Sequence, residues 1–126
     1  MSNKINEEKV KEIWSYFKKT QPVYLATSDK SNPRVRPVTL IYFKHKFWVA
    51  TGSEDAKMAQ IKSNSNFEFC YSITDGKDMG YIRGSGKIDT VTEIKTKKEL
   101  LENIEFIQYF WKDPADQGYT LLKLNI

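Results

Sequence analysis

The stretch VYLATSDKSNPRVRPVTLIYFKHKFWVAT, residues 23–51, decides the fold of this chain. It contains three runs rich in β-branched and aromatic residues, separated by two short polar connections. The runs are 23–28, 34–43 and 47–51, and the connections are 29–33 and 44–46. Such runs favour strands, whereas clusters of Asp, Ser, Asn and Pro favour turns. The stretch therefore predicts three consecutive antiparallel strands joined by tight connections. Pro37 cannot donate a hydrogen bond to a neighbouring strand, so it predicts an edge or a bulge in the second strand.

Three more strands are expected in the second half of the chain. They are predicted at 66–74, 81–91 and 118–126, with a turn at 75–80. The first of them alternates, with one face formed by Phe67, Phe69, Tyr71 and Ile73. In the second, Gly84 and Gly86 share a face. Glycines at this spacing remove side chains from one strip of a sheet, which permits either a sharp barrel bend or the close approach of a flat group.

Three helices are predicted around these strands. Residues 6–19 carry an apolar stripe at helical spacing, formed by Val10, Ile13, Trp14 and Phe17. A short helix is expected at 53–63, with Ser53 as its N-cap, and a charged helix at 93–104. Six strands with two or three peripheral helices predict a mainly β fold, a small closed or half-open barrel. A chain of 126 residues is long enough for one domain only, which we assign to residues 1–126.

The composition is that of a globular protein, with 40% hydrophobic and 29% charged residues. The single cysteine excludes an internal disulfide and fits a reducing compartment. The sequence has neither a signal-peptide pattern nor an apolar run long enough to span a membrane, so a cytoplasmic protein without membrane contact is expected. The net charge of +4 is compatible with nucleic acid and with a phosphate-bearing cofactor.

Several classes of site have no residues to support them. His45 is the only histidine, and it lies between two lysines at an expected hairpin tip, with no cluster of metal ligands in sequence around it. Cys70 is expected to be an inert, buried thiol within a strand. No hydrolase, nucleotide-triphosphatase or dinucleotide motif occurs. The lysines at 95–98 alternate with glutamates, which is typical of a solvated helix face and not of a nucleic-acid site. No metal site is predicted, and no catalytic residue can be named.

Two segments could bind an anion. In PRVRPV (33–38), Arg34 and Arg36 interrupt an otherwise apolar strand, and a guanidinium group suits a pair of phosphate oxygens. In ATGSEDAK (50–57), a strand ends at a glycine, hydroxyl groups follow, and a helix begins with Lys57 in its first turns. A helix N-terminus with hydroxyl donors and a lysine is a general anion site. The alternatives are that the arginines reach water at an edge and that Lys57 is a surface residue.

The two segments in this order resemble the FMN-binding split-barrel proteins related to pyridoxamine 5′-phosphate oxidase. The matching features are PRVRPV, FWVATG at the end of the third strand, the short helix with Lys57, and RGSGK on a later strand. The resemblance implies a six-stranded antiparallel split barrel that forms a homodimer with FMN between the subunits. It covers nearly the whole chain, from about residue 20 to residue 125.

The resemblance also implies a set of cofactor-binding residues. Arg36 and Lys57 would hold the FMN phosphate, Thr51 and Ser53 would assist, and Arg34 would make a further contact to the phosphate or an edge. The backbone at Pro37 and Val38 would run beside the isoalloxazine ring, and Trp111 would approach the flavin of the other subunit. The family often has a hydroxyl residue two positions before the lysine, whereas here Asp55, with Glu54 before it, brings negative charge close to the expected phosphate.

The function implied is that of an FMN-dependent oxidoreductase with an unknown substrate and electron donor. The chain ends at Ile126 without the Arg- and His-containing segment with which true pyridoxamine phosphate oxidases grip substrate, so short members of the general-stress type are the closer match. Two alternatives remain open. The barrel could be a non-catalytic module for flavin, deazaflavin or haem, or it could bind single-stranded nucleic acid, although its aromatic residues alternate as core residues do.

Overall fold

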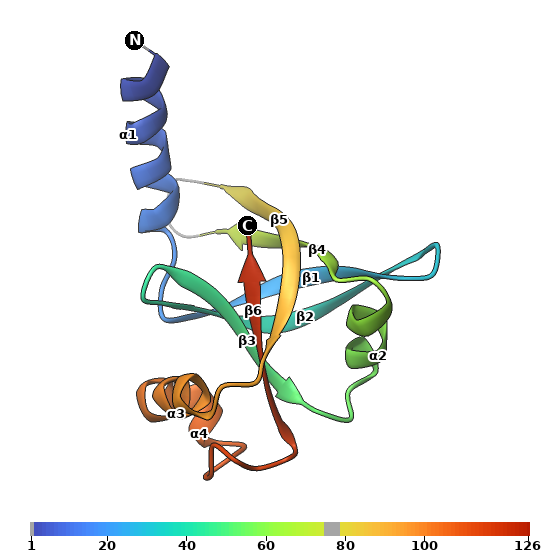
Figure 1. Ribbon diagram of the computed structural model, residues 1–126. Helices are drawn as coiled ribbons and strands as arrows, with labels where there is room; N and C mark the ends of the chain where they lie inside the picture. The colour runs from blue at the N-terminus through green and yellow to red at the C-terminus, as the bar shows by residue number, and fades with distance from the viewer. Residues whose placement is uncertain (1, 75–78) are drawn as a thin grey trace.

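The computed structural model describes residues 2–74 and 79–126, and within them the strands outnumber the helices (Figure 1). The elements follow the predicted order, with one additional short helix. They are α1 (Ser2–Ser15), β1 (Thr20–Asp29), β2 (Asn32–Phe43), β3 (Lys46–Gly52), α2 (Ala56–Ser63), β4 (Asn66–Ile73), β5 (Gly80–Val91), α3 (Ile94–Asn103), α4 (Glu105–Gln108) and β6 (Tyr119–Asn125). The turn predicted at 75–80 lies largely outside the described residues.

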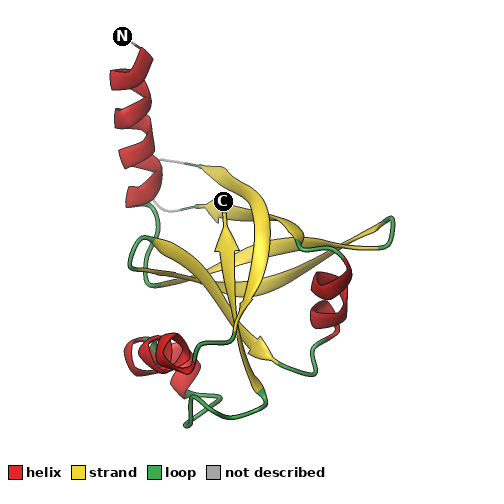
Figure 2. Ribbon diagram, viewed as in Figure 1, coloured by secondary structure: helices red, strands yellow, loops and turns green. Residues whose placement is uncertain are grey.

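The six strands form a closed antiparallel barrel, and the helices lie around it (Figure 2). The strand order is β1-β2-β3-β6-β5-β4, and β4 pairs with β1 to complete the circle. The predicted fold class, a mainly β six-stranded antiparallel barrel with peripheral helices, is confirmed.

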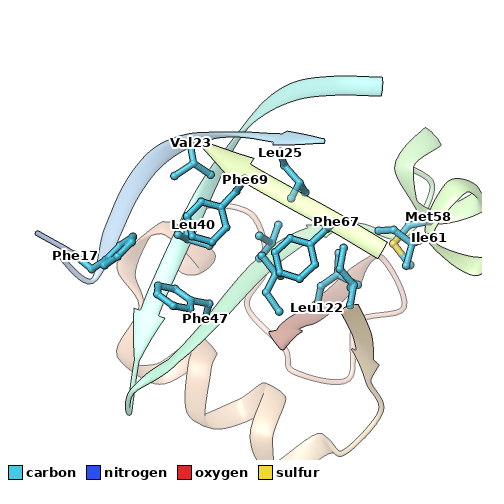
Figure 3. Close-up of a cluster of buried hydrophobic side chains, with 13 residues drawn as sticks. Phe17, Val23, Leu25, Leu40, Phe47, Met58, Ile61, Phe67, Phe69 and Leu122 are labelled. Carbon is cyan, nitrogen blue, oxygen red and sulfur yellow. The ribbon is translucent and has the colours of Figure 1, made fainter. Parts of the chain in front are cut away.

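The interior of the barrel is filled by alternate residues from all six strands (Figure 3). Strand periodicity places one residue in two on the inner face, as the sequence alternation predicted for β4. Phe67 and Phe69 of that strand are buried, with ring centroids 6.4 Å apart. Met58 and Ile61 of α2 pack against the same cluster, so α2 belongs to the barrel core. The other members are Phe17, Val23, Leu25, Leu40, Phe47, Val49, Ile88, Leu122 and Leu124.

A second apolar cluster lies on the outer face of β2, β3 and β6, beneath α3 and α4. Ile41 and Trp48 belong to this cluster, whereas their chain neighbours Leu40 and Phe47 face the barrel interior. The C-terminal part of β2 and residues 47–51 of β3 are therefore covered on both faces, which explains why their sequences are apolar at consecutive positions.

Gly84 and Gly86 of β5 allow close packing within the barrel. A Cβ atom on Gly84 would lie 2.6 Å from the Phe69 ring, and one on Gly86 would collide with the backbone carbonyl of Asn125. Of the two explanations left open by the sequence, a sharp bend or the close approach of a flat group, the contacts show a close approach, by groups of the protein itself. The flat partner of this strip is Phe69 together with the β6 backbone, so the strip is not a wall for a flavin.

Helix α1 begins and ends earlier than the sequence predicted. It ends at Ser15, so Phe17 lies beyond the helix, where it packs edge-on against Phe47 with ring centroids 4.9 Å apart. Trp14 stacks on the same ring at 5.3 Å. Of the predicted stripe, therefore, Trp14 and Phe17 pack on the Phe47 ring, whereas Val10 and Ile13 are exposed. Pro22 lies within β1.

Candidate functional site

Strand β2 is paired along its whole length on one side but only at one end on the other. On the β1 side the pairing runs from Asn32 to Ile41. On the β3 side it covers only Ile41–Phe43, opposite Lys46–Trp48. Before Ile41, therefore, β2 and β3 are not hydrogen-bonded to each other, and the backbone of β2 keeps unpaired groups on that side. This split, which includes Pro37, agrees with the edge position that the proline predicted.

An open cleft of about 330 Å³ occupies the split. Its walls come from the diverging strands, with Val49 and Ala50 of β3 facing Pro37 and Val38 of β2. Helix α2 contributes Lys57, and α4 contributes Phe106, which no sequence pattern indicated as a site residue. Pro22 and Thr39 complete the lining.

Lys57 is a buried cation at the start of α2. Its side chain is only 7% exposed, and its Nζ lies 2.9 Å from Oδ2 of Asp55. Asp55 is also the N-cap of α2, because its Oδ1 accepts a hydrogen bond from the backbone N–H of Lys57 at 3.0 Å. The prediction that Ser53 caps a helix from 53 to 63 is thus wrong. A carboxylate cap suits the positive end of the helix dipole better than a hydroxyl, and it shortens the helix by two to three residues.

Arg36 approaches α2 from the barrel side. It is opposite Leu25 in the β1–β2 ladder, so the two side chains lie on the same, interior face of the sheet. Its Nη1 donates to Oγ1 of Thr27 at 2.9 Å, and its Nη2 donates to Oε1 of Gln60 at 2.7 Å. A weaker bond of 3.3 Å reaches the carbonyl of Leu25. All three acceptors are neutral, so they orient the guanidinium without cancelling its charge.

Asp55 links the two cations electrostatically. Partial burial alone would raise the pKa of Asp55, but hydrogen bonds from Lys57 and the charges of Lys57 and Arg36 outweigh it, so the pKa lies below its ordinary value. Burial lowers the pKa of Arg36, and the charge of Asp55 partly offsets this. We call Arg36, Asp55 and Lys57 the anion cluster. With two positive charges and one negative charge beside an open cleft, it can attract an anionic ligand.

The other predicted cofactor residues are placed differently. Pro37 and Val38 share the cleft with Lys57. Thr51 is buried in β3, opposite Thr120 of β6. Ser53 is held outside the cleft, because its hydroxyl bonds to the carbonyl of Gln117 and to the Thr120 hydroxyl, both at 2.6 Å.

Arg34 and Trp111 lie apart from the anion cluster. Arg34 is 53% exposed near the β1–β2 turn, where its guanidinium is 3.9 Å from Asp29. Trp111 follows α4 and stacks on Tyr119, with ring centroids 5.1 Å apart. Within one chain, therefore, only part of the predicted set converges on the cleft.

Three contributors were not predicted from the sequence. Thr27 and Gln60 hold Arg36 in place and hydrogen-bond to each other at 2.8 Å, and Phe106 forms one wall. Gln60 lies one helical turn after Lys57, on the same helix, and this spacing was the one available indication. Nothing local marks Thr27 or Phe106, because their role depends on which strand or helix lies beside them.

No cluster of potential metal ligands occurs among residues 2–74 and 79–126. His45 is exposed in the β2–β3 turn, and its Nδ1 lies 3.2 Å from the Tyr42 hydroxyl. Over the same residues, no helix is both long and apolar enough to cross a membrane.

The sequence and the fold were compared with those of known proteins. The model of a protein family described as "Pyridoxamine 5'-phosphate oxidase like" matches residues 8–126. The fold is similar to that of a NimC/NimA family protein from Clostridium acetobutylicum, with a TM-score of 0.75 and 21% identity over 91% of this chain and 81% of the other. General Stress Protein 26 from Bacillus anthracis gives a TM-score of 0.73 and 20% identity over 91% and 86%.

A heme binding protein from Mycobacterium smegmatis shares the fold as well. Its TM-score is 0.68 and its identity is 10%, over 86% of this chain and 47% of the other. At such identities these structures show a common fold only. No match was found among curated proteins.

Proposed function

The chain belongs to the pyridoxamine 5′-phosphate oxidase-like family, and we propose that it is a flavoprotein that binds FMN at the split between β2 and β3. The observation that carries the proposal is that Arg36 and Lys57 converge on α2: Lys57 lines the cleft together with Pro37 and Val38, and Arg36 donates a hydrogen bond to Gln60, one turn after Lys57. Because the two cations come from different elements, their convergence is a property of the fold and not of a local motif.

The phosphate end of FMN fits the anion cluster. A phosphate monoester carries nearly two negative charges, and burying it requires cationic partners. Arg36 is oriented by three neutral acceptors and so presents a fixed charge, while Lys57 presents a buried ammonium group. Hydrogen bonds from these two cations to a phosphate would be charge-assisted, and such bonds are stronger than those between neutral groups.

The ring end fits the cleft. Apolar walls from Val38, Ala50 and Phe106 suit a flat ring, and the unpaired side of β2 offers backbone groups to its polar edge. The role of these residues is to bind and orient the cofactor. FMN itself would supply the chemistry, acceptance and donation of hydride or electrons, so no acid or base in the protein is required. We accordingly propose an oxidoreductase, with substrate and electron donor unassigned.

We further propose that the protein acts as a homodimer with FMN between the subunits. The cleft is open on one side, and a partner would complete its wall. The adjoining outer face of β1 and β2 exposes Tyr24, Val35 and Pro37, and apolar groups gathered in this way favour a protein interface. In such a dimer Trp111 would approach the flavin of the other subunit. The single cysteine favours a reducing, cytoplasmic compartment.

The second candidate is a binding module without turnover. The flavin form of this module would use the same residues, and kinetics with electron donors would separate it from an enzyme. A haem module is less well supported, because haem iron usually needs an axial ligand, and the only histidine lies in the β2–β3 turn, outside the cleft.

The test is cofactor analysis of the purified protein. We expect a yellow protein from which acid releases FMN, and a Soret band would instead indicate haem. Lys57→Ala and Arg36→Ala should each weaken FMN binding about tenfold or more, because each removes a charge-assisted contact. Lys62→Ala is the matched control, since Lys62 is exposed in the last turn of the same helix. A colourless protein that does not bind added FMN would refute the proposal.

A further inference from the structure

The carboxylate of Asp55 is paired with the ammonium group of Lys57, the group that a ligand anion in the cleft would contact. Its Oδ2 lies 2.9 Å from the ammonium group, and its other oxygen caps α2. The side chain of Asp55 is 44% exposed, whereas that of Lys57 is 7% exposed. Lys57 lines the cleft and Asp55 does not, so an anion that reaches Lys57 through the cleft must share the ammonium group with the carboxylate.

The charge balance makes sharing unfavourable. Arg36 and Lys57 contribute two positive charges and Asp55 one negative charge, which leaves one net positive charge for the ligand. A phosphate monoester brings nearly two negative charges and would also face the carboxylate at short range. Like charges at such distances repel measurably even in a partly solvated site.

We propose that Asp55 is a specificity-determining residue, an internal counter-ion that makes this site respond weakly to the phosphate of a flavin. The inference rests on the proposed function, because it assumes that flavin binds at the split. It predicts that wild-type protein gains little affinity from the phosphate group. The ratio of the riboflavin to the FMN dissociation constant measures that gain directly, because the two ligands differ only in the phosphate.

Asp55→Asn tests the inference with little structural disturbance. Asparagine caps helices as well as aspartate does, so the hydrogen bond from the Lys57 N–H is retained while the charge is lost. Titrations followed by flavin fluorescence should show the riboflavin-to-FMN ratio rising about tenfold in the variant, with riboflavin affinity itself unchanged. Asp55→Ser, which removes the charge and retains a capping oxygen, should act in the same direction.

Glu54→Gln is the matched control. Glu54 precedes Asp55, is exposed, and forms no ion pair with the residues that the structure describes. Loss of its charge should leave the ratio within about twofold of wild type, because an exposed charge is screened by salt. An equal rise in both variants would show a general effect of charge and would overturn the specific role of Asp55.

The remaining outcomes separate this inference from the proposed function. If wild type binds FMN and Asp55→Asn leaves the ratio unchanged, the inference fails and the proposed function stands. If no version of the protein binds flavin, the proposed function fails, and inorganic phosphate then decides the inference. At matched ionic strength, phosphate should raise the melting temperature of Asp55→Asn more than that of wild type. Equal shifts would overturn the inference.

Discussion

The two sides of strand β2 differ in what they contribute to the protein. On the β1 side the ladder is continuous and the side chains behind it form the barrel core. On the β3 side the ladder stops before Ile41, and an open cleft, with Lys57 in its mostly apolar lining, occupies the gap. The backbone of β2 is thus paired with a strand on one side and, before Ile41, is not paired with β3 on the other. We expect the first side to govern stability and the second to govern binding, and four measurements test this division.

Removal of a core ring should have the largest effect. Phe69→Ala would leave a cavity among Phe17, Phe47 and Phe67, and we expect the free energy of unfolding to fall by about 3–5 kcal/mol. Chemical denaturation measures this change. Tyr81→Ala is the control, because its ring is exposed on the neighbouring strand, and it should cost about 1 kcal/mol or less. Equal losses would show that the barrel interior is not the main source of stability.

Substitution of Gly86, in the glycine strip of β5, should cause the second-largest loss of stability. Gly86→Ala would force a methyl group into the Asn125 carbonyl, so β5 and β6 must separate, and we expect a loss of about 2–3 kcal/mol. At Gly80, in the same strand, an added Cβ atom meets nothing within 4 Å. Gly80→Ala should therefore change stability by about 0.5 kcal/mol or less in the same denaturation experiment. A well-tolerated Gly86→Ala would contradict the closure described for this edge.

Substitution of Lys57, at the split, should lower FMN affinity and leave the free energy of unfolding nearly unchanged. Lys57→Met preserves the length of a buried side chain and removes its charge, and Asp55, the partner left behind, is 44% exposed and can be solvated by water. We expect the free energy of unfolding to change by about 1 kcal/mol or less, while FMN affinity falls about tenfold or more. Denaturation and flavin titration of the same preparation check both. A large loss of stability would give Lys57 a structural role instead.

Acid pH should produce the smallest effect. Because the pKa of Asp55 in the folded protein lies below its ordinary value of 3.8, its charged form stabilises the fold. This contribution is complete above about pH 4 and is lost as the pH falls through the lowered folded-state pKa. Asp55→Asn should therefore reduce the dependence of stability on pH below about pH 4, measured by denaturation at several pH values. An unchanged dependence would show that Asp55 is not paired in solution.

Much of the barrel was predictable because its periodicities are local. The alternation of Phe67 and Phe69, the proline at an edge and the polar tip around His45 each have a meaning that depends on a few neighbouring residues. The wrong start predicted for α2 also came from reading a short segment by itself. The start of α2 was assigned to Ser53 because serine and aspartate are both good caps, and the choice between them was made by the hydroxyl contacts of Ser53 across the sheet.

Half of the site was predictable and half was not. Arg36 and Lys57 attracted attention as cations in apolar or helix-start contexts, but the residues that orient Arg36 come from β1 and α2 and carry no local mark. Arg34, two residues from Arg36, has the same composition around it and lies instead near the β1–β2 turn. Equivalent sequence surroundings thus led to different places in the fold.

The amino-acid sequence alone determined the strands, their order and the two cations that could hold an anion, because strand periodicity and charge are properties of short segments. Only the tertiary structure decided that β2 and β3 part before Ile41, that Gly84 and Gly86 make room for Phe69 and β6, and that Arg36 reaches Gln60 of α2. The reason is physical. Pairing, close packing and ion contacts depend on distances between segments far apart in the chain, and those distances exist only once the barrel has closed.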